Sequence, residues 1–214
     1  MVDLAGMVSD RSTPEDESLF NRWRDGDTEA GRALFSRHYE AVAGFFLGKV
    51  GEKTPDLVQR TFLACVEGAE RYRGEGTFRS YLYGIAYKTL CKHYRERARA
   101  STIDDVEQTS LYEFEPTPSA VIVDRQEQRL VLEALRRVPL QVQVILELYY
   151  WERMTADRIG EILEMPVGTV RTKIRRGKLR LRELIEQLAD SDELQRSTLS
   201  NLDSWAQGVR ALLG

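Results

Sequence analysis

Apolar residues recur at intervals of three and four along most of this 214-residue chain. One such stripe consists of Leu57, Val58, Thr61, Phe62, Cys65 and Val66. This spacing places apolar side chains on one face of an α-helix, whereas a strand would alternate apolar and polar residues. Apolar residues make up 42% of the chain, which is enough for one large or two small cores. The pattern predicts an all-α protein.

Residues typical of helix ends divide the first hundred positions. Gly26 fits the end of one helix, and Asp27 fits the N-cap of the next. Thr54 followed by Pro55 fits an N-cap with proline at the first helical position, and Thr77 fits a further helix start. We therefore expect several successive helices in this part of the chain.

A change in composition divides the chain into segments. Residues 101–124 contain two prolines and six acidic residues without a helical stripe, which is typical of a linker. The predicted organisation is a disordered amino terminus at 1–14, a helical domain at 15–100, an acidic linker at 101–124, a second helical domain at 125–189 and a carboxyl-terminal extension at 190–214. The extension ends in a helical stripe formed by Leu202, Trp205, Val209 and Leu212. This stripe either packs back on a domain or binds a partner protein.

Positive charge is concentrated near the carboxyl end, although the whole chain carries a formal net charge of −3. Residues 153–182 contain nine basic residues against three acidic ones. Within this segment, Thr155 fits the cap of a short amphipathic helix, residues 165–168 break that helix, and a second one is expected from about Thr169. Two helices joined by a turn of about four residues form a helix-turn-helix.

The second of these helices has an apolar and a polar face. The apolar face consists of Val170, Ile174, Leu181, Leu184, Ile185 and Leu188. The polar face consists of Thr169, Thr172, Arg175, Arg176 and Arg180, with Lys173 at its edge. Arginine can bind guanine through two hydrogen bonds, and flanking cations can displace counterions from phosphate. The one-sided charge favours a DNA-reading helix over a solvated basic helix, although Leu179 on the polar side and Gly177 within the helix depart from the pattern.

Aromatic and basic residues are interleaved between positions 72 and 99. The aromatic residues are Tyr72, Phe78, Tyr81, Tyr83, Tyr87 and Tyr94, and the basic ones are Arg73, Arg79, Lys88, Lys92, Arg95, Arg97 and Arg99. A buried stripe is expected at Leu82, Ile85, Ala86, Thr89 and Leu90, which leaves Tyr83 and Tyr87 for the surface. Exposed aromatics that stack on bases, with cations along the backbone, bind single strands with little sequence demand. The competing interpretation is that these tyrosines pack within the fold.

Other classes of function find little support in the sequence. The longest apolar runs fall short of the roughly 20 residues that span a bilayer, and the amino terminus lacks the pattern of a secretory signal, so we expect a cytosolic protein. Cys65 and Cys91 are expected to be reduced, buried thiols. With two histidines and no cluster of potential ligands, the sequence predicts no metal, no cofactor and no enzymatic activity.

Four stretches, taken in order, resemble the extracytoplasmic-function sigma factors of bacterial RNA polymerase. They are GDTEAGRALFSRHY in the first helices, DLVQRTFL at 56–63, FRSYLYGIA at 78–86 and PVGTVRTKIRRGKLRLREL at 166–184. The resemblance covers about residues 15–188. It implies a factor that directs core RNA polymerase to promoters and helps to open them. The implied partners are core RNA polymerase, promoter DNA as duplex and as single strand, and an anti-sigma protein.

The resemblance also assigns roles to individual positions. The polymerase clamp would bind Asp56, Gln59 and Arg60, where Arg60 replaces the acidic residue usual in the family. The minus-ten element would bind Tyr72, Arg73, Arg79, Tyr83, Tyr87, Lys88, Lys92 and Arg95. The minus-thirty-five element would bind Thr169, Arg171, Thr172, Lys173, Arg175 and Arg176. Lys88 and Lys92 stand where the family commonly has asparagine and aspartate, so no base preference is transferred.

Two questions stay open at this point. Residues 149–151, Tyr-Tyr-Trp, fit either core packing or a contact with the polymerase flap. A conventional helix-turn-helix regulator, which binds duplex DNA as a dimer without polymerase, is the alternative function. The aromatic and basic stretch at 72–99 argues against that alternative.

Overall fold

The computed structural model of the protein describes residues 14–69, 76–98, 105–114, 125–202 and 204. Within these ranges the chain forms helices, turns and an isolated bridge between Ser110 and Pro139, without a β-strand. The helices are α1 (Pro14–Arg24), α2 (Thr28–Val50), η2 (Gly51–Lys53), α3 (Thr54–Gly68), α4 (Phe78–Ala98), α5 (Leu111–Phe114), α6 (Gln126–Arg136), α7 (Leu140–Tyr150), α8 (Ala156–Leu163), α9 (Val167–Leu188) and α10 (Asp192–Ser200). The predicted all-α fold is confirmed. None of the described helices is long and apolar enough to cross a membrane.

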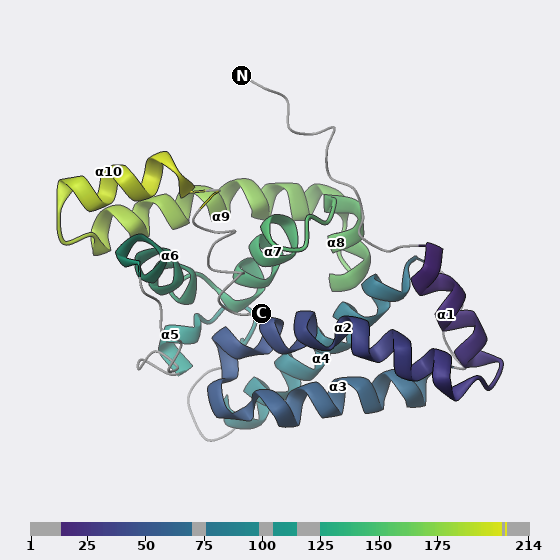
Figure 1. Ribbon diagram of the computed structural model, residues 1–214. Helices are drawn as coiled ribbons and strands as arrows, with labels where there is room; N and C mark the ends of the chain where they lie inside the picture. The colour runs from purple at the N-terminus through teal and green to yellow at the C-terminus, as the bar shows by residue number, and fades with distance from the viewer. Residues whose placement is uncertain (1–13, 70–75, 99–104, 115–124, 203, 205–214) are drawn as a thin grey trace.

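Helices α1 to α4 form an amino-terminal helical unit (Figure 1). The cap at Asp27 is confirmed, because its carboxylate accepts a hydrogen bond from the backbone N–H of Ala30 at 3.0 Å. Just before it, Gly26 has a φ of 100°, a conformation that glycine adopts without strain, and this ends α1 in a tight turn. The Glu17 carboxylate of α1 accepts a hydrogen bond from the backbone N–H of Phe78 at 2.9 Å. This bond ties α1 to the first turn of α4, where backbone N–H groups lack helical partners.

The helix start expected at Thr54 differs in detail. Thr54 is the first residue of α3 rather than its cap, and its Oγ1 donates a hydrogen bond to the Gly51 carbonyl at 2.7 Å. The reason is that η2 leads into α3 without an extended residue between them, so the hydroxyl bonds back to the preceding turn. Thr77 does act as a cap, since its Oγ1 accepts a hydrogen bond from the backbone N–H of Ser80 at 3.2 Å.

Helices α8 and α9 form the predicted helix-turn-helix. Thr155 caps α8 as expected, with its hydroxyl accepting a hydrogen bond from a backbone N–H three residues later. The helix ends because Glu164 adopts a left-handed conformation with a φ of 54°. Helix α9 begins at Val167, two residues before the expected Thr169, because Pro166 takes the extended backbone of the residue that precedes a helix.

The apolar face of α9 packs on the carboxyl-terminal core. Its buried members are Val170, Ile174, Leu181, Leu184 and Ile185. Gly177 is also buried, and a Cβ added there would lie 2.7 Å from Cγ1 of Val142 on α7. The glycine therefore permits close approach of α7 and α9, which explains its presence inside a helix. Leu179 is 57% exposed, as its position on the polar face predicts.

Helix α10 belongs to the carboxyl-terminal extension and packs against α6 and α9 (Figure 1). Thr198 and Leu202 are buried, and Leu194 and Leu199 are half-buried against the same apolar cluster. This part of the extension therefore packs on the second helical domain, whereas the role of the stripe itself stays a prediction. The other expected stripe residues, at positions 205, 209 and 212, lie outside the described residues.

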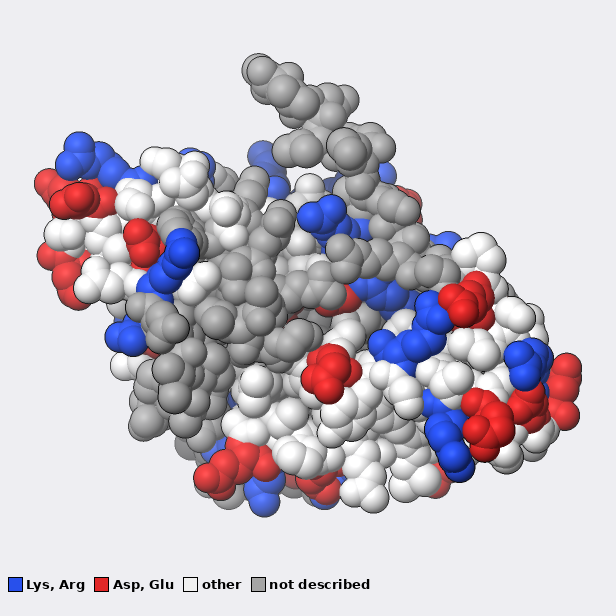
Figure 2. All heavy atoms as spheres, viewed as in Figure 1, with Lys and Arg blue, Asp and Glu red and all other residues white. Residues whose placement is uncertain are grey.

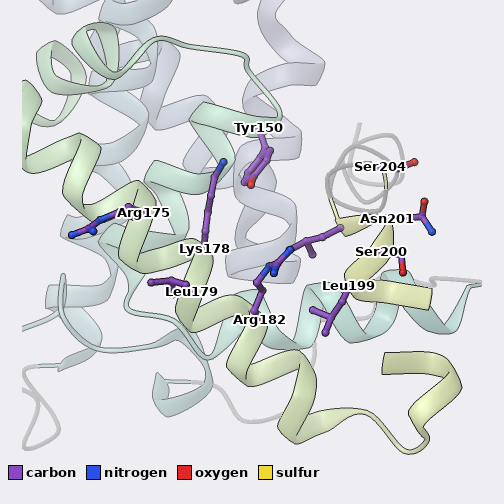
Figure 3. A pocket seen from close by; sticks show the side chains of 10 residues that line it. Tyr150, Arg175, Lys178, Leu179, Arg182, Leu199, Ser200, Asn201 and Ser204 are labelled. Carbon is purple, nitrogen blue, oxygen red and sulfur yellow. The ribbon is translucent and has the colours of Figure 1, made fainter. Parts of the chain in front are cut away.

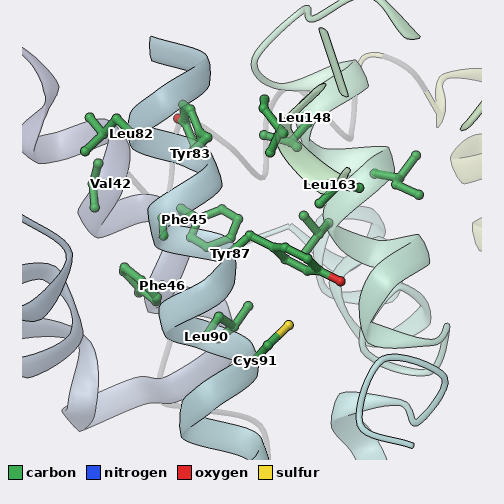
Figure 4. Packing of buried hydrophobic residues seen from close by; sticks show 14 of the residues in the cluster. Val42, Phe45, Phe46, Leu82, Tyr83, Tyr87, Leu90, Cys91, Leu148 and Leu163 are labelled. Atoms are coloured by element: carbon green, nitrogen blue, oxygen red, sulfur yellow. The ribbon is translucent and has the colours of Figure 1, made fainter. Parts of the chain in front are cut away.

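The amino-terminal and carboxyl-terminal helices share a continuous apolar core. Phe45 of α2 and Tyr83 and Tyr87 of α4 belong to the same buried cluster as Leu148 of α7 and Leu163 of α8. Figure 4 shows the two tyrosines on α4 between these groups. Helix α4 accordingly packs against α8, and the structure is a closed arrangement of the two halves of the chain.

Candidate nucleic-acid interface

The basic face of α9 remains open in the closed arrangement. Thr169, Arg171, Arg175 and Arg176 are exposed, and Thr172 and Lys173 are half-buried. The Thr172 hydroxyl donates to the Gly168 carbonyl at 2.9 Å, which leaves its oxygen able to accept a further hydrogen bond. All six positions expected to read duplex DNA thus lie on the first three turns of one helix, after the turn that ends α8.

The expectation that Tyr83 and Tyr87 lie on the surface is wrong for this structure. Tyr83 is 2% exposed and Tyr87 is 7% exposed. Helix α8 covers the side of α4 that the helical wheel left for solvent, the Tyr83 ring packs edge-on against Phe45 of α2, and Gln141 of α7 contacts the Tyr87 hydroxyl. Arg79, another residue expected to bind the minus-ten strand, is also buried. Tyr72 and Arg73 lie outside the described residues.

Glu107 lies at the centre of a polar cluster between α4 and α7. Its carboxylate accepts hydrogen bonds from the Tyr87 hydroxyl at 3.1 Å, from Nε2 of Gln141 at 2.7 Å and from Nη2 of Arg95 at 2.7 Å. The backbone N–H of Gln141 also donates to the Glu107 carbonyl at 3.0 Å. Burial raises the pKa of the Tyr87 hydroxyl, with Cys91 and Glu107 adding to the rise, so this group stays a neutral donor. The acidic segment is therefore bound to two residues expected to contact DNA.

Two further cations of α4 are paired with carboxylates of the carboxyl-terminal helices. Arg79 forms a buried ion pair with Glu152, which follows α7, and also donates to the backbone carbonyl of that residue at 3.2 Å. Lys88 forms an ion pair with Glu164 at 2.5 Å, and both side chains are largely exposed. An exposed pair of this kind contributes at most about 1 kcal/mol, whereas a buried pair is costly to break.

A buried ion pair also joins α2 to α7. The Lys49 ammonium donates to the Glu147 carboxylate, whose other oxygen accepts a hydrogen bond from Nε2 of Gln143 at 2.8 Å. Burial lowers the pKa of Lys49 and raises that of Glu147, and the attraction between the two groups opposes both shifts. The ammonium also lies 4.3 Å from the centre of the Phe45 ring, which adds a cation–π contact.

The residues expected to bind polymerase lie beside an apolar groove that sequence reasoning did not identify. Asp56 and Arg60 are exposed and form an ion pair with each other at 3.0 Å, and Gln59 is exposed one position before Arg60. The groove between α2 and α3 has a volume of about 580 Å³. Its lining includes the exposed apolar side chains of Tyr39, Leu63 and Val66. The missed signal was Leu63, an apolar residue that departs from the helical stripe of its neighbours.

A second cavity joins positions from two of the predicted sites. It has a volume of about 410 Å³, lies between α3 and α4, and is lined in part by Arg60, Lys88 and Lys92. On the face shown in Figure 2, charge of both signs is interspersed at the end formed by α1 and α2. The structure thus places one residue expected to bind polymerase next to two expected to bind DNA.

The extension lies beside the basic face of α9. A cavity of about 750 Å³ between them is lined by Arg175, Lys178 and Arg182 of α9 and by Ser200 and Asn201 of the extension (Figure 3). The Lys178 ammonium lies 4.7 Å from each of the ring centres of Tyr149 and Tyr150. With Trp151 buried, these contacts favour the packing role of the three aromatic residues.

Both cysteines are free and buried, as expected. Burial raises the pKa of the Cys65 thiol to about 12 and that of the Cys91 thiol to about 11. Thiols with such values are protonated near neutral pH and react slowly. Cys91 lies on α4, one turn after Tyr87 and on the side that faces the carboxyl-terminal helices (Figure 4).

Comparison with known proteins identifies the class of protein that this fold defines. Residues 34–100 match the family model "Sigma-70 region 2", and residues 128–189 match "Sigma-70, region 4". The chain is 30% identical over 180 residues to the ECF RNA polymerase sigma-E factor of Haemophilus influenzae, covering 80% of this chain and 93% of that one. It is 25% identical over 172 residues to the sigma-E factor of Escherichia coli K12, covering 76% and 90% of the two chains.

Solved structures show the same fold. CnrH in complex with the cytosolic domain of CnrY matches with a TM-score of 0.59 and 20% identity over 82% of this chain and 99% of that one. RpoE in complex with the anti-sigma factor NepR from Bartonella quintana matches with a TM-score of 0.54 and 18% identity over 76% and 99%.

The chain belongs to the sigma-70 family, in its extracytoplasmic-function (ECF) group. It is a sigma factor, which directs core RNA polymerase to promoters in transcription initiation and binds promoter DNA. The conventional helix-turn-helix regulator is the less favoured alternative. Sigma factors are generally non-enzymatic regulators.

Proposed function

We propose that α9 reads the minus-thirty-five element in the major groove and that α4 with the loop before it captures the minus-ten strand. The observation that carries the first part is the open basic face of α9, the second helix of the helix-turn-helix, on which Arg175 and Arg176 are exposed. Arginine at such positions can bind guanine edges, and the nearby threonines can bind either kind of base. The second part is supported by the aromatic and basic residues of α4, where, once α4 is uncovered, Tyr87 could stack on a base and Arg95 could contact a phosphate.

Polymerase docking is assigned to the groove between α2 and α3. Gln59 lies on its polar rim, Asp56 and Arg60 are exposed nearby on α3, and Tyr39 and Leu63 provide exposed apolar area. An interface with an apolar centre and a polar rim is the usual form of a protein–protein contact. The groove lies on the side of α3 away from the carboxyl-terminal helices, so polymerase could dock before the chain opens.

Binding of both promoter elements requires separation of α4 from α8. In the closed arrangement Tyr83, Tyr87 and Arg79 are buried, so a strand cannot reach them. The 24 residues of 101–124 span at most about 80 Å when extended, and two turns of duplex measure about 70 Å. The segment is therefore long enough for the two halves to occupy both elements.

The partners of the protein indicate where in the cell it acts. We place the chain in the cytoplasm, where polymerase and the chromosome meet, and assign it no catalytic step of its own. An anti-sigma protein is a further proposed partner, because the solved neighbours include a complex with the anti-sigma factor NepR.

Transcription by core polymerase from a promoter library, with and without the protein, tests these assignments. We expect new start sites that share two upstream elements. The double variant R175A/R176A should lose starts that depend on the upstream element, whereas R24A/R196A, which removes two exposed arginines of α1 and α10, should retain them. Tight duplex binding by the protein alone without new starts would instead favour the conventional regulator.

A further inference from the structure

The cations that α4 offers to DNA are matched by carboxylates of the same chain. Four described positions of the predicted minus-ten site are basic: Arg79, Lys88, Lys92 and Arg95. Three of them pair with an acidic residue outside the amino-terminal helices, in the pairs Arg79–Glu152, Lys88–Glu164 and Arg95–Glu107. The three carboxylates come from three different segments: the acidic linker, the residues after α7 and the end of α8.

The geometry at Glu107 resembles that of a bound phosphate. One anionic group accepts hydrogen bonds from a guanidinium and from a tyrosine hydroxyl, at 2.7 Å and 3.1 Å. The same two donors, Arg95 and Tyr87, are those expected to contact a DNA strand through its backbone and bases. The linker is held in this place by backbone bonds, from Leu140 N to Thr109 O at 2.9 Å and from Gln141 N to Glu107 O at 3.0 Å.

We infer that Glu107, Glu152 and Glu164 act as an internal substitute for strand phosphates on α4, so that the free protein excludes single-stranded DNA by occupying its cation sites. This inference rests on the proposed role of α4 in minus-ten recognition. The inference goes beyond the burial of α4 under other helices. A DNA strand would have to displace each carboxylate from its cation, and each carboxylate that stays in place would repel the strand. Promoter DNA and the acidic segments are therefore competitors for the same residues.

The test uses the full chain and a labelled 12-residue oligo-dT, since stacking platforms bind single strands with little sequence demand. The double variant E107Q/E164Q removes the two carboxylates that lie nearest solvent, with side-chain exposures of 28% and 70%. The control E113Q/E133Q removes the same total charge from residues that bond to Ser110 and Arg137 rather than to α4. We expect the first variant to bind the oligonucleotide about 2- to 30-fold more tightly than the wild type, which is the combined contribution of two such pairs. We expect the control to match the wild type.

A second variant distinguishes the effect of the carboxylate charges from the effect of burying α4 under α8. Gly84 of α4 faces α8, and a Cβ there would already be in van der Waals contact with the Ile162 carbonyl, at 3.7 Å. The further carbons of leucine in G84L should therefore wedge the two helices apart without changing a charge. Opening is followed in each variant by the rate at which Cys91 reacts with a disulfide reagent. If G84L raises both the thiol rate and the DNA affinity while E107Q/E164Q changes the affinity no more than its control, the carboxylates are not substitutes for phosphate and the inference is overturned.

Transcription with core polymerase distinguishes this failure from failure of the proposed function. If every chain supports promoter starts and oligonucleotide affinity is the same in all of them, only the inference fails. If none of the chains, closed or opened, binds the oligonucleotide or supports starts, the role of α4 fails and the inference fails with it.

Discussion

Lys49 and Glu147 are 98 residues apart in the chain and form a buried ion pair that joins the end of α2 to the middle of α7. The Lys49 carbonyl also accepts a hydrogen bond from the Tyr94 hydroxyl, so the end of α2 is tied to α4 as well. The pair lies within the core that the two halves of the chain share, where water cannot replace a lost partner. Leaving either partner buried without the other would therefore be costly to the closed arrangement.

Removing one member of this pair should open the molecule. E147Q leaves the Lys49 ammonium in an apolar site, at a cost of about 3–5 kcal/mol to the closed arrangement. Opening relieves that cost because the ammonium then reaches water, so we expect faster modification of Cys91 rather than global unfolding. The double replacement K49M/E147L, which keeps the volume and removes both charges, should restore a slow rate. A slow rate in E147Q would show that the pair does not hold the closed state.

Replacement of Gly177 should destabilise the carboxyl-terminal helices. In G177A the added Cβ would lie 2.7 Å from Val142 Cγ1, and the strain of such overpacking, about 1–3 kcal/mol, exceeds the gain of about 1 kcal/mol in helix propensity. G168A is the matched control, because no atom lies within 4 Å of a Cβ at that position of the same helix. Urea unfolding followed by circular dichroism should show a lower midpoint for G177A alone. Equal urea midpoints for G177A and G168A would mean that α7 and α9 accommodate the added methyl group without strain.

The exposed groove residue Leu63 should matter for polymerase binding. It is 56% exposed, and an aspartate there would place a charge in the apolar centre of the proposed interface. We expect L63D to weaken binding to core polymerase about tenfold or more, which corresponds to about 1.4 kcal/mol. L179D changes a leucine of nearly equal exposure, 57%, on α9 and should bind core polymerase as the wild type does. Surface plasmon resonance with immobilised core enzyme measures both, and equal loss in the two variants would reject the groove.

Stability should fall as the pH is lowered through the histidine range. Burial lowers the pKa of His38 below its usual value of 6.5, and the nearby Asp16 carboxylate only partly opposes this. The unfolded chain then binds a proton more readily than the folded one, so the contribution of His38 is complete above about pH 6.5 and is lost as the pH falls towards the folded-state pKa. Glu147, whose pKa burial raises, acts in the opposite direction.

The pH dependence of stability in H38Q, compared with that of the wild type, tests this prediction. The free energy of unfolding, taken from urea titrations between about pH 5 and 7.5, should depend less steeply on pH in H38Q than in the wild type. His93, whose pKa is also lowered by burial, supplies a part of the slope that remains in H38Q. An unchanged slope in H38Q would show that the buried imidazole does not titrate differently on folding.

Capping residues and apolar periodicity predicted most helices well, because the residues that begin or end a helix lie within a short stretch of sequence. The caps at Asp27 and Thr155 and the apolar face around Val170 and Ile174 follow from such stretches. The packing of α4 against α8 could not be predicted in this way. Tyr83 and Tyr87 lie on the face that a helical wheel assigns to solvent when α4 is considered alone.

The candidate site, too, could be predicted only where it depends on a single helix. The duplex-reading face of α9 could be predicted because its charge is one-sided within a single helix. The pairing of Arg95 with Glu107 depends on which segments meet, and the two residues lie twelve positions apart without a periodic signal of that contact. Leu63 departs from the apolar stripe of its helix, and this departure can be seen in the sequence. Its proposed role in polymerase binding could be inferred only from the groove that it lines with α2.

The central claim is that this sigma factor is closed when free and opens to bind a promoter. Spin labels attached at Glu40 of α2 and Gln187 of α9, both exposed, in a chain with Cys65 and Cys91 replaced by serine, allow the distance between the two halves to be measured by double electron–electron resonance. We predict one narrow distance distribution for the free protein and a distinctly longer one with core polymerase and promoter DNA. A broad, long distribution in the free protein, unchanged on adding polymerase and DNA, would contradict the account.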